Sequence, residues 1–203
     1  MGAAFAAVQL VDIAWAGFIL TGVEHARLTP GFLAASNLDL YDMPWTHALP
    51  AALAWSAAAA LVYRLIARSG GWASAIAIGA LVFSHWILDF LVHTNDLLLY
   101  PGGPRVGLGW WDNPPLAMGA ELGLFALGFV LYLRATTAAG AVGRIAPWLT
   151  AGLMLAVLAF EKLGPVPPSI EQAATSALIV YLLFVAMGFW LDRVRVFRRA
   201  SLD

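Results

Sequence analysis

The sequence predicts an all-α protein, a polytopic membrane bundle of about six transmembrane helices. Of its 203 residues, 62% are hydrophobic and only 11% are charged, and the mean hydropathy is +0.81. A soluble domain carries about 25% charged residues, so this deficit indicates that lipid is the solvent. Six segments also have about the 20 apolar residues that a helix needs to cross the hydrocarbon core.

The six predicted spans follow one another with short connections, which favours a single transmembrane domain over residues 1–203. They cover residues 3–24, 47–67, 72–94, 115–134, 145–162 and 173–192, and the fifth is the shortest. The first span lacks the basic start and the small-residue cleavage site of a signal peptide, so we expect it to remain as a helix. The second contains AALAWSAAAALVY, and such small residues favour close helix packing in a membrane.

The basic residues predict the orientation of the bundle, because Lys and Arg concentrate in cytoplasmic loops. One side receives Arg64, Arg68, Arg134, Arg144, Arg193, Arg195, Arg198 and Arg199, and the other only Arg27, Arg105 and Lys162. This bias places both termini in the cytoplasm. The loops at 25–46, 95–114 and 163–172 are then on the outer side.

Charge and cysteine content exclude some classes of partner and site. The formal net charge is −1 and the isoelectric point is about 6.4, which gives no reason to expect nucleic-acid binding. The chain has no cysteine, so it forms no disulfide and no thiolate metal site. A metal would therefore need nitrogen and oxygen ligands.

Residues 83–97, FSHWILDFLVHTNDL, place four titratable side chains inside the third apolar span: His85, Asp89, His93 and Asp96. At about 100° per residue, all four fall within about 80° of the helix circumference. A charged side chain at membrane depth costs about 3 kcal/mol, so we expect this stripe to face the bundle interior. A His/Asp pair at i and i+4 can present nitrogen and oxygen to one cation.

The predicted topology brings other polar residues to the same outer side. Glu24 ends the first span, Asp42 lies in the first outer loop, His47 opens the second span, and Glu121 lies about two turns inside the fourth. The sequence therefore predicts one polar cluster that draws on several helices.

Three other polar residues have simpler explanations. Asp12 lies in the cytoplasmic half of the first span, and we expect it to pair with a neighbouring helix. For Asp96, an equally good interpretation is that it caps the end of the third span or is solvated there. His25 is close to the interface and beside Arg27, so solvation explains it well.

The polar residues also carry a resemblance to a known family. The stretches GVEHARLTPG, NLDLYDMPWTHALPAALAWS and SHWILDFLVHTNDLLLYPGGPRVGLGWWDNP resemble bacterial inner-membrane proteins, the predicted membrane-bound metal-dependent hydrolases of the YdjM type (DUF457-like). The shared core is Thr46-His47 and Ser84-His85 with Asp89, and the resemblance covers about residues 10–134. That group is distantly similar to zinc-dependent phospholipase C and P1-type nucleases, which implies zinc and a phosphoester substrate. The four histidines suit one or two divalent ions.

Our leading hypothesis is a metal-dependent hydrolase at the outer face of the bacterial inner membrane. His47, His85 and Asp89 would hold the metal, with Glu24, His93 or Glu121 completing the shell. Glu121 or Asp42 would be the general base toward a water whose pKa the cation lowers. The expected substrate is a membrane lipid or a lipid-linked phosphoester, guided by Trp110 and Trp111 at headgroup level.

The alternative is non-catalytic. The same cluster would then be a structural metal site or the polar core of an accessory subunit in a larger membrane complex. A path for ions or protons ranks lower, because the inner halves of the second, third and fourth spans carry almost no titratable residue.

Overall fold

The structure, a computed structural model, describes residues 1–67 and 70–198 and confirms the all-α, polytopic prediction. Arg68 and Arg199, two of the residues used for the orientation, lie outside the described part. The helices found there are α1 (Gly2–Val8), α2 (Leu10–Thr21), α3 (Leu49–Ile66), α4 (Gly71–Val92), α5 (Pro114–Ala135), α6 (Ala141–Leu163) and α7 (Ile170–Val194). The helix α6 has 23 residues and is longer than the fifth span predicted.

The first predicted span is a broken helix. Its two parts, α1 and α2, meet at Gln9 with a bend of 53°. No proline or glycine marks this point, so the sequence pattern does not reveal it. Within the described residues, α3 to α7 are each long and apolar enough to cross a membrane, and α1 with α2 makes a sixth span if the bent pair is one crossing.

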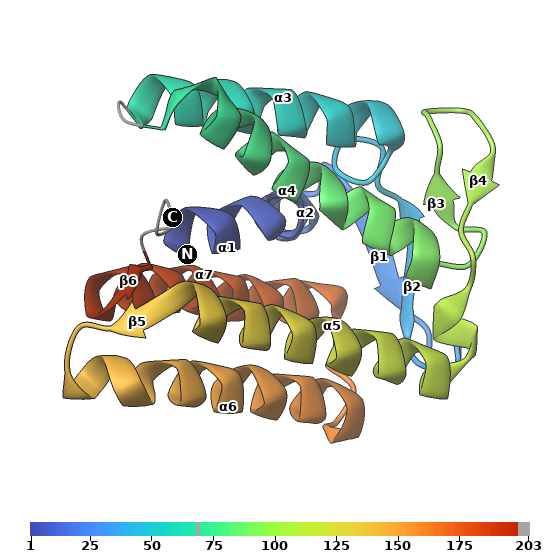
Figure 1. Cartoon of the computed structure of the whole chain (residues 1–203). Helices are drawn as coiled ribbons and strands as arrows, with labels where there is room; N and C mark the ends of the chain where they lie inside the picture. The colour runs from blue at the N-terminus through green and yellow to red at the C-terminus, as the bar shows by residue number, and fades with distance from the viewer. Residues whose placement is uncertain (68–69, 199–203) are drawn as a thin grey trace.

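Short antiparallel strands close the two ends of the bundle (Figure 1). At one end, which we call the hairpin end, lie β1 (His25–Leu28) with β2 (Leu38–Asp42), β3 (Leu97–Leu98) with β4 (Arg105–Val106), and the short 3-10 helix η1 (Trp110–Asp112). At the other, which we call the terminal end, lie the N-terminus and the pair β5 (Thr136–Ala138) with β6 (Arg195–Phe197). The hydropathy pattern of the sequence does not predict these strands.

Local sequence explains where several helices begin. The α3 helix has Pro50 in its first turn and α5 begins with Pro114, positions where a missing N–H costs nothing. The side chain of Asn113 accepts a hydrogen bond from the Leu116 N–H, and Ser169 caps α7 in the same way.

The bent pair α1–α2 occupies the middle of the molecule, between α4 and α7, while α3 packs along α4 (Figure 1). One apolar cluster joins α2 to β1, β2 and α7, with Trp15 and Ile19 of α2 at its centre. A second joins α1 and α2 to α4 through Val11 and Val82. The broken helix is therefore buried by its neighbours and places its break inside the bundle.

At the terminal end, Arg195 ties α7 to α6. Its guanidinium donates to the Gly143 carbonyl at 2.7 Å and to the Thr136 hydroxyl at 2.9 Å. The Gly143 carbonyl lacks its helical partner because Pro147, four residues on, has no N–H. Gly143 is also tightly enclosed, since a Cβ there would collide with the Val194 carbonyl oxygen.

We therefore expect Gly143→Ala to destabilise the bundle, because the added methyl group meets backbone that cannot move aside. Overpacking of this kind costs about 1–3 kcal/mol, which thermal unfolding in detergent, followed by circular dichroism, would show as a lower Tm. Gly152→Ala is the matched control on the same helix, because its Cβ meets nothing within 4 Å. Equal Tm values for the two variants would contradict the close α6–α7 contact.

Candidate metal centre

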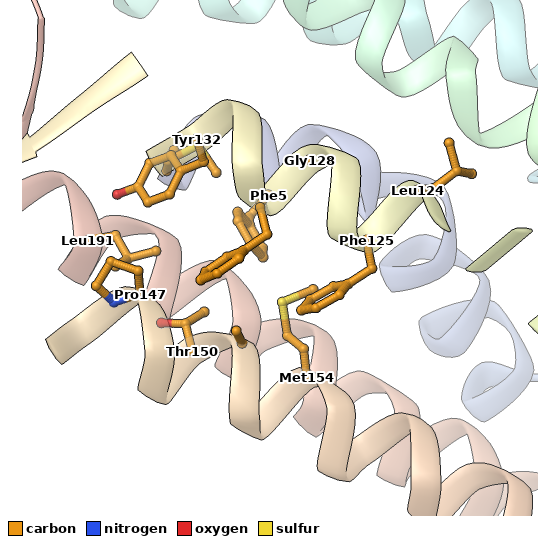
Figure 2. A pocket seen from close by; sticks show the side chains of 12 residues that line it. Phe5, Leu124, Phe125, Gly128, Tyr132, Pro147, Thr150, Met154 and Leu191 are labelled. Carbon is orange, nitrogen blue, oxygen red and sulfur yellow. The ribbon is translucent and has the colours of Figure 1, made fainter. Parts of the chain in front are cut away.

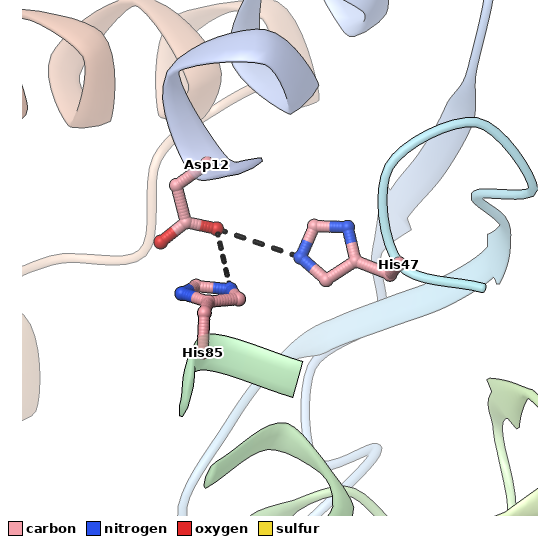
Figure 3. Close-up of side chains that lie close together, drawn as sticks. All are labelled: Asp12, His47 and His85. Atoms are coloured by element: carbon pink, nitrogen blue, oxygen red, sulfur yellow. Dashed lines mark ion pairs between the residues drawn. The ribbon is translucent and has the colours of Figure 1, made fainter. Parts of the chain in front are cut away.

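Three side chains that could hold a metal ion meet inside the bundle: Asp12, His47 and His85. Asp12 lies in the first turn of α2, directly after the helix break. His47 lies in the turn before α3, and His85 lies in the second half of α4. Figure 3 shows both imidazoles directed toward the same carboxylate. One potential ligand atom from each residue lies within 4.8 Å of the other two.

The Nε2 atoms of the two histidines share the Asp12 oxygen Oδ1, at 3.5 Å from His47 and 3.4 Å from His85. A second carboxylate borders the same space. Asp89, one turn after His85 on α4, places Oδ2 at 3.2 Å from His85 Nε2 and at 3.7 Å from His47 Nε2. Two imidazoles and two carboxylates therefore form one cluster, which we call the Asp/His cluster.

The proton on His47 is fixed by a chain of hydrogen bonds from Glu24. The Thr46 hydroxyl donates to Glu24 Oε2 at 2.6 Å and lies 2.7 Å from His47 Nδ1. A hydroxyl has one proton, and the carboxylate takes it, so His47 Nδ1 must donate to the Thr46 oxygen. In the neutral imidazole, His47 Nε2 is then the nitrogen with the lone pair, and it faces the cluster.

The proton on His85 is fixed by the helix break. Its Nδ1 lies 3.3 Å from the carbonyl oxygen of Val8, the last residue of α1. A carbonyl can only accept, so His85 Nδ1 carries a proton, and in the neutral imidazole Nε2 keeps the lone pair. Irregular backbone at membrane depth persists where it is buried or lines a site, and here the break serves to orient a ligand candidate.

Two buried carboxylates that face two imidazole Nε2 atoms need positive charge between them, which a metal cation or protons on the imidazoles supply. His85 Nε2 and Asp89 Oδ2 are buried without a hydrogen-bond partner among the described residues. Their separation of 3.2 Å is also longer than the 2.7–2.9 Å of a direct charged hydrogen bond. Ligands at about 2.0–2.1 Å from a tetrahedral cation are about 3.3 Å apart, close to the observed spacing. The Asp/His cluster thus has the composition and spacing of a metal centre.

Glu24 was predicted as a metal ligand, and the structure gives its carboxylate other partners. Its side chain is almost fully buried. Oε1 accepts the N–H groups of Trp45 and Thr46 at 2.7 and 2.9 Å, and Oε2 accepts the Thr46 hydroxyl. Glu24 therefore supports His47 through Thr46 and does not itself face the cluster.

His93, another predicted ligand, lies where α4 ends. Its Nδ1 lies 3.0 Å from Asp96 Oδ1, and its ring packs against Trp111 at 4.7 Å between centroids. The loop after β4 encloses it, because the Gly109 N–H donates to the His93 carbonyl at 2.7 Å. Gly109 has φ +70°, a conformation that favours glycine. The side chains of His93 and Asp96 thus form a pair beside the Asp/His cluster.

The two predicted general bases pair elsewhere. Glu121, on α5, has Lys162 of α6 at 3.8 Å. Asp42, on β2, pairs with His25 of β1 at 2.9 Å, and both of these side chains are about half exposed. The structure brings neither carboxylate into contact with the Asp/His cluster.

Two residues at the cluster are not among the predicted ligands, although Asp12 was expected to pair with a neighbouring helix and does so with His85 of α4. Asp12 was assigned to the cytoplasmic half, although at about 1.5 Å per residue its depth in the first span differs from that of His85 in the third by only a few ångströms. Comparing depths would have found it. Tyr181 of α7 lies near Asp12, and an aromatic residue in an apolar span gives no such signal.

No protein-family model, curated protein or solved structure matches the chain. The resemblance to YdjM-type hydrolases therefore stays a prediction. Of the residues that carry it, His47, His85 and Asp89 meet in the cluster, and Thr46 orients His47. Ser84 instead donates to the Leu81 carbonyl of its own helix at 2.7 Å.

We expect detergent-purified protein to retain a divalent cation, because the cluster's lone pairs and carboxylates need positive charge. His47→Ala and His85→Ala should each reduce bound metal to background, as measured by elemental mass spectrometry. His25→Ala is the control, since His25 lies on the exposed β1–β2 hairpin. Wild-type protein without metal, or equal loss in the control, would contradict the site.

Thr46→Val should weaken metal binding while keeping the ligands in place. The change removes the hydroxyl that connects Glu24 to His47, and loss of such an orienting hydrogen bond typically costs about 10–100-fold in metal affinity. Titration calorimetry with Zn²⁺ and Co²⁺ would measure the change. Thr21→Val is the matched control, because the Thr21 hydroxyl bonds only to backbone carbonyls of α2. Unchanged affinity in Thr46→Val would show that the chain from Glu24 does not orient His47.

Proposed function

We propose that this protein is a membrane-bound, zinc-dependent hydrolase that acts on a lipid or lipid-linked phosphoester. The observation that carries the proposal is the pair of imidazoles whose Nδ1 atoms are both held by acceptors, so that both Nε2 lone pairs meet Asp12 Oδ1. Orientation of histidine ligands by a second partner is the usual feature of metal sites in proteins.

Zinc is the cation that this ligand set suits best. The chain has no cysteine, and two imidazole nitrogens with a carboxylate oxygen match the His and acidic ligands of zinc hydrolases. Asp12, His47 and His85 supply three ligands. Catalytic zinc sites have three protein ligands and one open position, whereas structural sites are closed by four. The role of Asp89 therefore decides between the two types.

We assign Asp89 as the general base. Its Oδ2 atom is buried, has no hydrogen-bond partner among the described residues, and lies against both Nε2 atoms. From there it can accept a proton from a water that attacks the substrate and return it to the leaving oxygen. A bound divalent cation would polarise the phosphoryl or carbonyl oxygen of the substrate. Of the three carboxylates Asp89, Glu121 and Asp42, Asp89 belongs to the Asp/His cluster.

The position of the cluster suits a lipidic substrate. His85 lies seven residues before the end of α4, so the site is about 10 Å from the hairpin end. The side chains of Asp12, His85 and Asp89 keep 23%, 15% and 13% of their surface exposed, whereas His47 keeps 5%. The carboxylates and His85 are thus partly exposed as side chains, while the atoms His85 Nε2 and Asp89 Oδ2 are buried. By the positive-inside rule the hairpin end faces outward, which would place the reaction at the outer leaflet of the bacterial inner membrane.

The non-catalytic alternative rests on the same four residues. If Asp89 is a fourth ligand, Asp12, His47, His85 and Asp89 form a closed shell, which is the arrangement of a structural site. The protein would then be a metal-stabilised membrane subunit whose activity lies in a partner.

The Asp89→Asn variant distinguishes the catalytic function from the structural one. If Asp89 is the base, the variant should bind Zn²⁺ within about tenfold of wild type and lose about 10²–10⁴-fold in turnover. Release of product from phosphatidic acid, phosphatidylglycerol and polyprenyl phosphates would measure turnover, and Glu121→Gln serves as the control carboxylate. If Asp89→Asn loses metal as fully as His85→Ala does, the shell is closed and the structural function is correct.

A further inference from the structure

An apolar cavity lies away from the Asp/His cluster, toward the terminal end. It has a volume of about 230 Å³ and lies between α1, α5, α6 and α7. Figure 2 shows Phe5, Phe125, Met154 and Tyr132 around it. Apolar cavities stay dry, and one of about 150 Å³ already accepts a benzene molecule. This cavity is larger and part of it is open to the surface, so an apolar ligand can enter it.

The shape of the cavity follows the helix axes. Its lining on α5 runs from Leu124 to Tyr132, which is about 12 Å along the helix. The two hydroxyls in the lining belong to Thr150 and Tyr132, and the Thr150 hydroxyl donates to the Ala146 carbonyl at 3.0 Å. The walls therefore offer little hydrogen bonding. An extended hydrocarbon chain that lies parallel to the helices fits this lining.

Three arginines lie at the terminal end, at the level along the helix axes where the cavity lining ends. Arg134 follows Tyr132 by two residues on α5, Arg144 precedes Pro147 by three on α6, and Arg193 follows Leu191 by two on α7, which is about 3–5 Å along each axis. All three arginine side chains are exposed, and none has an ion-pair partner within the described ranges. The acidic residue at this end, Asp192, pairs with the Met1 amino group at 2.6 Å.

We propose that this cavity binds one acyl chain of an anionic phospholipid, with the phosphate at the arginines of the terminal end. The apolar walls take the chain, and the exposed arginines complement the negative headgroup. Basic residues beside a gap between membrane helices on the cytoplasmic side commonly bind anionic headgroups. The site is independent of the metal centre, so it stands or falls separately from the proposed hydrolase function.

Gly128 gives a direct way to fill the cavity. It lines the cavity on α5, and a Cβ there meets nothing within 4 Å, so the side chain of Gly128→Leu begins beside the cavity without a Cβ clash. Gly123→Leu is the matched control, because Gly123 is on the same helix, also has no neighbour within 4 Å, and does not line the cavity. Ala151→Leu fills the same space from α6.

Native mass spectrometry of the detergent-solubilised protein measures the binding. Protein is mixed with equal amounts of phosphatidylglycerol and phosphatidylcholine that have identical chains. We expect one phosphatidylglycerol to remain on wild type and on Gly123→Leu, and at least a tenfold loss in Gly128→Leu and Ala151→Leu. Circular dichroism identifies any variant that fails to fold. Lipid loss in one folded cavity-filling variant is enough to test the proposal.

The charge requirement is tested with Arg144→Gln combined with Arg193→Gln. Each arginine removed should reduce the preference for phosphatidylglycerol over phosphatidylcholine about fivefold, while Arg195, which holds α6 and α7 together, stays in place. Equal retention of the two lipids by wild type would overturn the proposal. The proposal would also be overturned if Gly128→Leu retained as much lipid as Gly123→Leu. It would be overturned as well if wild type formed a dimer without bound lipid and Gly128→Leu dissociated that dimer.

Discussion

Two imidazoles and two carboxylates face one another inside an apolar bundle, and much of the surrounding structure serves to hold them there. Each buried charge costs several kcal/mol unless it is compensated. The partners that fix the imidazoles are themselves unusual. One is a buried carboxylate, Glu24, acting through Thr46, and the other is a carbonyl of Val8 at a helix break. A continuous first helix would offer neither this carbonyl nor the present direction of Asp12.

The hairpin end works as a support for this arrangement. After α2 the chain turns at Gly22, which has φ +71°, and brings Glu24 under the turn that carries His47. The indole of Trp86 donates to the His47 carbonyl at 3.0 Å and thus ties that turn to α4. Arg105 donates both to the Asp96 carbonyl and to the Tyr41 carbonyl, so the two hairpins hold each other. The ligand candidates on separate helices are therefore fixed relative to one another.

The two ends of the bundle differ in chemistry. Polar side chains at the hairpin end pair with one another, as in Arg27 with Asp39 and His25 with Asp42. At the terminal end, Arg195 is fully engaged by backbone and Thr136, while its neighbouring arginines remain exposed. This asymmetry gives one end a rigid polar site and leaves the other with charge available to an anionic surface.

The sequence by itself determined the membrane class, the positions of the spans and half of the site. Hydropathy and charge placement act locally, so α3 to α7 match the predicted segments closely, and the spacing of His85 and Asp89 identified them on one helix face. Only the tertiary structure decided the rest. The break at Gln9 has no proline or glycine to announce it, because it is stabilised by contacts to α4 and α7 that are remote in sequence. For the same reason Asp12 joined the cluster, Glu24 became a support for Thr46, and Glu121 paired with Lys162. Each of those outcomes depends on how separate helices turn toward one another, which no single span encodes.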